Sequence, residues 1–213
     1  MPKTRVVIGL DFDNTLVSYD DVMLQTALEL NFLSGNPAVH TKQQIRDGIR
    51  TTPDGELKWQ ELQAEVYGKR MQKARLMEGV ARFLNACKDN NVSIFIVSHK
   101  TRYAAQDKEK INLQDTALNW MRQQHFFDKG GLGLSEDRVY FEHTRNDKVL
   151  RIKTLGCTHF IDDLPEVFLE KAFPDNTVQV LFSSGPTNCE GTLDGIKYFG
   201  HWNDIYDYFF VKP

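Results

Sequence analysis

Short runs of apolar residues recur along the chain and predict buried strands. The longest are Val6–Leu10, Val92–Val97 and Val178–Phe182, and a shorter run is His159–Ile161. These runs are nearly continuous rather than alternating, and they are rich in β-branched and aromatic residues. Both features are typical of strands that are covered on both faces, as in a parallel sheet. A further short strand is expected at Val139–Phe141.

Helical patterns separate these strands. Gly79–Asn90 and Asp147–Gly156 each carry apolar residues at helical spacing on one face, and Leu113–His125 also indicates a helix. An alternation of buried strands and amphipathic helices predicts an α/β fold. We expect a doubly wound, mainly parallel and Rossmann-like sheet.

The alternation breaks between residues 18 and 77. Three helices are expected there, Tyr19–Ser34, Thr41–Ile49 and Leu57–Leu76, separated by segments rich in Gly, Pro and Thr. This is too much helix for a single crossover between two strands. We therefore expect an α-helical cap at residues 18–77, inserted into an α/β core domain formed by residues 1–17 and 78–213.

Composition narrows the class of protein but not its chemistry. The 213 residues carry a formal net charge of -3, with 41% apolar and 26% charged residues, which is ordinary for a soluble globular protein. This mild acidity argues against a nucleic-acid polymer or an anionic membrane as partner. No apolar run approaches a transmembrane length, no signal peptide is recognisable, and the three cysteines are widely spaced. We expect a cytoplasmic protein with reduced thiols.

Three of the predicted strands run directly into residues suited to catalysis. Asp11 and Asp13 follow the first strand, Ser98 follows the second, and Asp162 and Asp163 follow the third. In an open parallel sheet, ligands bind at the carboxyl ends of the strands, so these groups are expected to converge. Four clustered carboxylates repel one another and stay ionised together only around a cation. An oxygen-only ligand set favours Mg²⁺.

The spacing of Asp11 and Asp13 allows both carboxylates to reach one reacting centre. One can then act as a nucleophile while the other gives and takes a proton. For the pair alone, an Asx turn that caps the next helix is an equally good interpretation. The position of the pair after an apolar strand and before Asn14-Thr15-Leu16 favours catalysis.

These residues resemble the motifs of a known superfamily. Asp11-Phe12-Asp13-Asn14-Thr15-Leu16 resembles motif I, D-x-D-x-T-L, of the haloacid dehalogenase-like (HAD) hydrolases. Ile94–Ser98 resembles motif II, Lys148 resembles motif III, and Phe160–Asp163 resembles motif IV. The four motifs occur in the family's order and cover most of the chain. The resemblance implies a HAD-like core with a helical cap inserted after motif I.

The resemblance also implies a role for each matching residue. Asp11 would be the nucleophile that forms an aspartyl-phosphate, and Asp13 would protonate the leaving oxygen and then activate water. Ser98 and Lys148 would hold the phosphoryl oxygens. The Mg²⁺ ligands that it implies are the Asp11 carboxylate, the Asp13 backbone carbonyl, Asp162 and, directly or through water, Asp163. Dehalogenases of the superfamily lack the second motif I carboxylate, so Asp13 favours phosphoryl transfer.

Lys148 has an independent physical argument. A helix dipole disfavours a cation at the N-terminus of a helix, whereas a bound anion there is attracted by both the lysine and the free amides. The alternative is a solvent-exposed lysine beside an N-cap at Asp147. Lys153 competes for the motif III role, but it lies a turn and a half further on and is expected to point elsewhere.

Other candidates rest on position alone. His99 and Thr15 are added as candidate phosphate-binding residues, with a solvated loop position and a plain ST turn as alternatives. Lys100, His143 and Arg145 lie near predicted strand or helix ends and could also touch substrate, but a solvated loop position is the preferred interpretation for each. A basic cluster on the last cap helix is expected either to bind a second anionic group of the substrate or to form a solvated face. It consists of Lys69, Arg70, Lys73 and Arg75, and the loop Ser183–Asn188 is a further candidate.

The sequence thus predicts a Mg²⁺-dependent phosphatase that hydrolyses a small-molecule phosphomonoester through an aspartyl-phosphate. The expected partner is a small phosphorylated metabolite, and the chain is expected to be a monomer or homodimer. Two alternatives stay open. One is a phosphomutase or phosphotransferase on the same core, and the other is a non-catalytic phospholigand-binding protein.

Overall fold

The chain folds into two compact units. The computed structural model describes residues 5–34, 41–183 and 195–211. The first unit, called here the α/β unit, comprises Met1–Val17, Leu76–Lys100 and Gln124–Pro213. The second, called the helical unit, comprises Ser18–Arg75 and Thr101–Gln123. The candidate loop Ser183–Asn188, beyond its first residue, and Cys189 lie outside the described residues.

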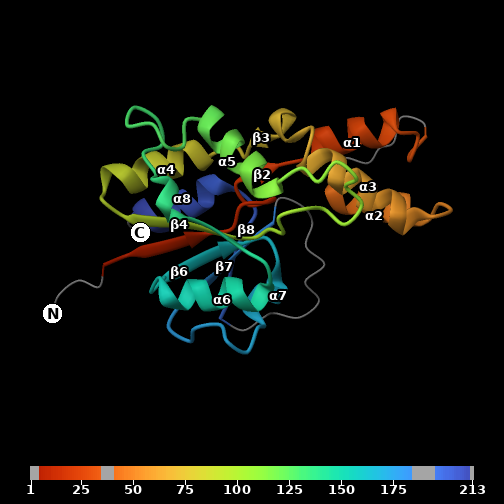
Figure 1. The fold of residues 1–213 in the computed structure, drawn as a ribbon. Coiled ribbons are helices and arrows are strands. Elements are labelled where there is room, and N and C mark those ends of the chain that lie inside the picture. Colours follow the sequence, from red (N-terminus) through yellow and green to blue (C-terminus); the bar gives the residue numbers. More distant parts are fainter. Residues whose placement is uncertain (1–4, 35–40, 184–194, 212–213) are drawn as a thin grey trace. The chain divides into compact units, whose positions relative to one another are not determined.

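A six-stranded parallel sheet forms the centre of the α/β unit (Figure 1). Its spatial order is β5-β4-β1-β6-β7-β8, so the order of the strands reverses between β1 and β6. The bounds are β1 Val7–Leu10, β4 Ser93–His99, β5 Val139–Glu142, β6 His159–Asp162, β7 Val178–Phe182 and β8 Lys197–Phe199. This order confirms the predicted doubly wound Rossmann-like fold.

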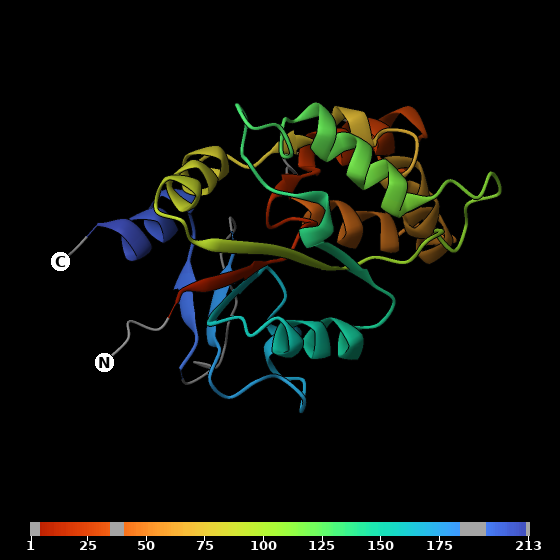
Figure 2. The same cartoon turned by 60° about the vertical axis from the view of Figure 1, so that its left-hand side comes forward.

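Helices cover both faces of the sheet, as Figure 2 shows. On one face lie α6 (Arg145–Thr154) and α7 (Pro165–Phe168), and on the other α4 (Val80–Asp89) packs against α8 (Trp202–Phe210). Because both faces are covered, the inner strands β1, β4, β6 and β7 are largely apolar, whereas the edge strand β8 is exposed at Lys197 and Tyr198. Gly9 in β1 is required by close packing, since a Cβ there would lie 2.5 Å from the ring of Phe160 in β6.

The helical unit contains one segment that the sequence analysis placed in the core. Its helices are α1 Asp20–Glu29, α2 Lys42–Arg50, α3 Gly55–Tyr67 and α5 Leu113–Gln123, with a 3₁₀ turn η1 at Met71–Lys73. The segment Thr101–Gln123 belongs here because α5 buries Ala117, Trp120 and Met121 within this unit, and the Trp120 Nε1 donates to the Ala74 carbonyl at 3.1 Å. The expected boundaries, a cap at 18–77 alone, therefore differ from the observed unit.

Several predicted boundaries also differ. The helix expected at Leu57–Leu76 ends at Tyr67, because Gly68 breaks it and the chain continues through η1 into the short strand β3 (Arg75–Leu76). The helix expected at Tyr19–Ser34 ends at Glu29, and Asn31 takes a left-handed φ of 56°. Strand β8 and helix α8 were not predicted. The remaining elements are β2 (Val17–Ser18), which pairs with β3, and the 3₁₀ turn η2 (Glu136–Arg138).

Within the described part of the chain, every helix is too short or too polar to span a membrane.

Candidate active site

The carboxyl ends of β1 and β6 bring the predicted acidic residues together. Asp11 comes directly after β1, and its backbone N–H donates to the carbonyl of Ile161 in β6 at 2.9 Å. Asp162 is the last residue of β6. The strand order reverses between these two neighbouring strands, and such a switch point is where open α/β sheets bind ligands.

Lys148 connects the two acids. Its Nζ lies 2.6 Å from the Asp11 Oδ1 and 2.6 Å from the Asp162 Oδ2. All three side chains are buried, with exposed fractions of 1% for Lys148, 5% for Asp11 and 0% for Asp162. Lys148 therefore faces the site, as the motif III interpretation predicted, whereas Lys153 is exposed.

The beginning of α6 fixes the position of Lys148. The N-cap is Thr144, whose Oγ1 accepts from the Asp147 N–H at 3.0 Å and donates to the Asp147 carboxylate at 2.7 Å. The alternative of an exposed lysine beside an Asp147 N-cap is thus wrong on both points. Thr144 satisfies one of the free amides of α6 and fixes the beginning of the helix, so Lys148, in the first turn, is held where its side chain extends to the strand ends.

The buried acids and lysine shift one another's ionisation. Burial raises the pKa of Asp11 to about 7, Lys148 opposes this rise, and Asp162 and Asp13 add to it. Burial alone would lower the pKa of Lys148, but the two neighbouring carboxylates raise it above its usual value. Lys148 is therefore a permanent cation, and a further cation beside Asp11 would favour the carboxylate form.

Three of the acids are placed to hold a metal ion. Carboxylate oxygens of Asp11, Asp162 and Asp163 all lie within 4.8 Å of one another. The second oxygen of Asp162, Oδ1, accepts from the Leu164 N–H at 3.0 Å, which fixes the orientation of this carboxylate. A set of hard oxygen donors fits Mg²⁺. The metal role expected for Asp13 concerned its backbone carbonyl, and it stays a prediction.

Asp13 has a lysine partner of its own, which the sequence analysis missed. The Nζ of Lys100 lies 2.8 Å from one carboxylate oxygen of Asp13 and 3.1 Å from the other. Lys100 is 4% exposed, so the preferred interpretation of this residue as a solvated loop residue was wrong. The two-residue repeat of side chains in a strand could have revealed this position, because Ser98 and Lys100 are two residues apart in an extended segment and share one side of the sheet.

The charges of the assembled site also fit a divalent cation. The site contains four carboxylates, of which Asp11 and Asp162 contact Lys148, Asp13 contacts Lys100, and Asp163 lies beside Asp11 and Asp162. The acids outnumber the lysines by two, which is the charge of one Mg²⁺ ion. Buried groups of like charge need such compensation.

The two hydroxyl candidates are both buried. Ser98 is 1% exposed and lies in β4, two residues past the Leu10–Ile96 pair, level with the turn that carries Asp13. Thr15 is fully buried, and its Oγ1 has no hydrogen-bond partner among the described residues. A buried hydroxyl without a partner costs about 1–3 kcal/mol. The phosphate-binding role expected for Thr15 and Ser98 stays a prediction.

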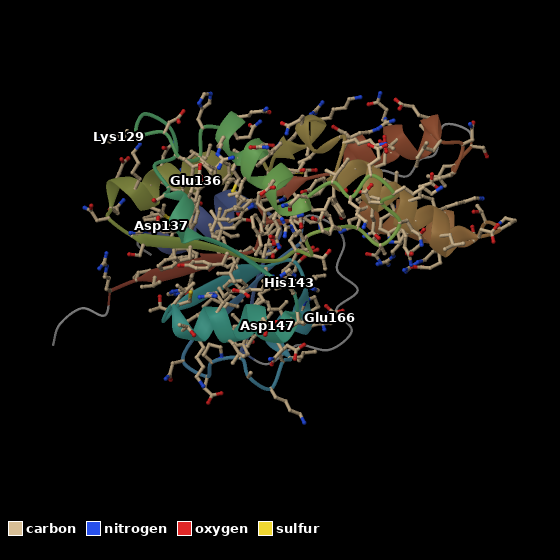
Figure 3. All side chains as sticks on the ribbon, in the orientation of Figure 1. Lys129, Glu136, Asp137, His143, Asp147 and Glu166 are labelled. Carbon is tan, nitrogen blue, oxygen red and sulfur yellow. The ribbon has the colours of Figure 1, made fainter. Side chains whose placement is uncertain are left out.

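His99 is not brought to the carboxylates. It is exposed, and its Nε2 lies 3.0 Å from the carbonyl oxygen of His143, which Figure 3 labels next to the beginning of α6. Side chains of neighbouring residues in a strand point to opposite faces of the sheet. The side chain of His99 therefore lies on the opposite face of β4 from that of Ser98. Arg145 pairs with Glu170 at 3.4 Å. The phosphate role expected for His99 has no support from this geometry.

The basic cluster of the helical unit is paired with acids. Lys69 contacts Glu65 and Glu109, Arg70 contacts Glu29 and Glu65, and Arg75 contacts Asp21. Lys73 is exposed. The expectation that these residues lie on a helix was wrong because α3 ends at Tyr67. Contact with a substrate stays a prediction for Lys69, Arg70 and Lys73.

Comparisons with known proteins place the fold. No protein-family model matches the chain, and no curated protein matches it. The chain is similar to the solved structure of a HAD hydrolase of family IA, variant 3, from Entamoeba histolytica, with a TM-score of 0.58 and 14% identity over 93% of this chain and 94% of that one. The chain has a HAD-like fold.

Two further solved structures share this HAD-like fold. A HAD family hydrolase from Deinococcus radiodurans R1, solved with bound phosphate and sodium, has a TM-score of 0.56 and 13% identity over 96% of this chain and 95% of that one. A HAD-superfamily hydrolase of subfamily IA, variant 1, from Geobacter sulfurreducens has a TM-score of 0.53 and 12% identity over 96% of each chain. The expected HAD-like α/β fold is therefore confirmed, and the helical cap stays a prediction.

Proposed function

We propose that this protein is a Mg²⁺-dependent phosphatase of the HAD superfamily that hydrolyses a small-molecule phosphomonoester. The observation that carries the proposal is Lys148, which bridges Asp11 and Asp162 at the switch point of the sheet. The cation is buried between two acids, and one of them, Asp11, is the first residue of the motif I stretch. A fixed positive charge at this place would neutralise the charged oxygens of a phosphoryl group.

In the proposed first step, Asp11 attacks phosphorus. Its Oδ1 is bonded to Lys148, which leaves Oδ2 to form the new O–P bond. The bond from phosphorus to the ester oxygen breaks, and Asp13 supplies a proton to that oxygen. Lys148 and Ser98 hold the phosphoryl oxygens. The product is an aspartyl-phosphate on Asp11 and a free alcohol.

In the second step, Asp13 takes a proton from a water molecule that attacks the same phosphorus. The bond between phosphorus and Asp11 breaks, which releases phosphate and restores the carboxylate. Asp11, Asp162 and Asp163 would hold Mg²⁺, which would supply positive charge to neutralise the phosphoryl oxygens. The site keeps both motif I carboxylates, which favours phosphoryl transfer over dehalogenation.

Substrate size, location and assembly remain proposals as well. We take the substrate to be a small phosphorylated metabolite and the protein to be cytoplasmic, as a monomer or homodimer. The helical unit would act as the cap. A phosphomutase or phosphotransferase and a non-catalytic phospholigand-binding protein would use the same residues, and the following experiment separates them.

The test is phosphate release from a panel of phosphomonoesters, with Mg²⁺ and with EDTA. The wild-type protein should release phosphate only with the metal, and Asp11→Asn should release none. Asp175→Asn is the matched control, since it makes the same change at an exposed position of the α/β unit. Transfer of labelled phosphate between substrate positions without release to water would favour a mutase. Binding of phosphorylated ligands without turnover would favour a non-catalytic protein.

A further inference from the structure

Lys100 is a buried cation at the carboxyl end of β4 that the proposed chemistry does not yet use. It is 4% exposed, and Asp13 is the acid that it contacts, with one ammonium group between both carboxylate oxygens at 2.8 and 3.1 Å. Lysine is almost never buried unless it is paired. A buried pair is costly to assemble and is weak evidence of a stabilising role.

The position of the ammonium group is fixed by the sheet. The Lys100 N–H donates to the Glu142 carbonyl at 3.0 Å, which continues the β4–β5 ladder by one residue. The Nζ lies 5.7 Å from the centre of the Phe12 ring, which is fully buried. Backbone and side chain are thus both held, so Lys100 presents a fixed cation.

Asp13, in contrast, lies in a turn. The next residue, Asn14, has a left-handed φ of 59°, and the side chain of Asp13 is 20% exposed. Contact of both carboxylate oxygens with a fixed cation restricts Asp13 to rotamers that keep this contact. Lys148 does not serve this purpose, since its two acids are Asp11 and Asp162.

We propose that Lys100 is a positioning residue that holds the Asp13 carboxylate in the orientation from which it exchanges a proton with the reacting oxygen. This inference rests on the proposed function, in which Asp13 serves the ester oxygen in the first step and water in the second. Both oxygens occupy the place opposite Asp11 in an in-line displacement. One fixed orientation of Asp13 therefore serves both steps.

The test exploits leaving groups. A p-nitrophenolate ion leaves without a proton, whereas an alkoxide needs one, so only the alkyl ester depends on a well-placed Asp13. In Lys100→Met, kcat/KM should fall about 100-fold for an alkyl phosphate and less than about threefold for p-nitrophenyl phosphate. The value of kcat/KM reports steps up to departure of the alcohol. The ratio of the two values is independent of the fraction of protein that is folded.

Three controls sharpen the result. Lys153→Met removes the same charge from an exposed position of α6 and should leave the ratio unchanged. Lys100→Gln keeps a hydrogen-bond donor and should restore part of the loss. In an Asp13→Asn background, Lys100→Met should change the ratio no further, because Asp13 is the group through which Lys100 acts.

The outcomes separate the two proposals. A wild-type protein that hydrolyses neither ester would overturn the proposed function and this inference together. If the wild type is active and Lys100→Met lowers kcat/KM equally for both esters, this inference alone is overturned. An additional effect of Lys100→Met in the Asp13→Asn background would do the same.

Discussion

The two units of the chain differ in how deeply their most buried ion pairs lie. In the α/β unit, Lys100 and Lys148 are 4% and 1% exposed, and each contacts acids at the ends of strands. In the helical unit, ion pairs range from the half-buried pair of Arg70 and Glu65 to the surface pair of Arg75 and Asp21, whose side chains are 76% and 75% exposed.

This difference in burial matters because exposed and buried ion pairs contribute differently to stability. Exposed ion pairs contribute roughly 0–1 kcal/mol and are screened by salt. Buried pairs often stabilise a fold no better than apolar residues of the same volume, although removal of one partner is strongly destabilising. We therefore interpret the two buried lysines, Lys100 and Lys148, as parts of the proposed site rather than as stabilising ion pairs.

The largest effect is expected from Lys148→Met. Two buried acids would lose their cation, so phosphate release should fall about 10³-fold. The free energy of unfolding should fall by about 3–5 kcal/mol. Steady-state kinetics and chemical denaturation measure the two losses, and Lys153→Met in the same helix is the control. Equal losses of phosphate release and of unfolding free energy in the two variants would contradict the expected difference between buried and exposed lysines.

Cys87 and Cys157 show what burial does without an opposite charge. Both are free thiols in the α/β unit, and burial raises the pKa of each to about 12. Since the thiolate is the reactive form, alkylation by iodoacetamide at pH 8 should be about 1000-fold slower than in the denatured protein. Peptide mass spectrometry follows each cysteine separately. Alkylation at the denatured rate would show that these sites are open.

Metal binding should stabilise the α/β unit. At 100 times its dissociation constant, Mg²⁺ should raise the free energy of unfolding by about 2.7 kcal/mol through mass action. The Asp162→Asn variant should lose this gain, whereas the exposed Asp175→Asn should keep it. Calorimetry with and without Mg²⁺ measures the effect. An undiminished gain in Asp162→Asn would place the ion elsewhere.

The smallest effect is expected in the helical unit. A double-mutant cycle of Arg75→Gln and Asp21→Asn should give a coupling energy below about 1 kcal/mol that decreases further at high salt. Denaturant unfolding of the four proteins measures the coupling. A coupling of several kcal/mol would mean that exposure does not separate the two kinds of ion pair.

The sequence predicted the sheet and its chemistry better than the helical unit. Strands such as β4 and β7 are largely continuous apolar runs. The acids at the ends of β1 and β6 follow from strand order and motif spacing. The helix expected to continue to Leu76 ended at Tyr67 because Gly68 outweighed a favourable pattern beyond it. The assignment of Thr101–Gln123 depends on tertiary packing of Trp120, which no local pattern reveals.

Within the site, sequence reasoning found the acids but judged the cations by their average behaviour. Lys148 was found through motif order. Lys100 was missed because lysine is usually exposed, although its two-residue spacing from Ser98 placed it on the same side of β4. The same period argues against His99, which lies between them and contacts the backbone of His143 instead.

The account as a whole depends on Asp11 as the nucleophile that becomes phosphorylated. Trapping of the phosphoenzyme tests this role most directly. A turnover reaction with Mg²⁺ and a phosphomonoester would be quenched in acid, digested and mapped by mass spectrometry. The account predicts phosphate on the peptide that contains Asp11, at that residue, and none in Asp11→Asn. Phosphate release with no phosphorylated residue, or with the phosphate on a different residue, would contradict it.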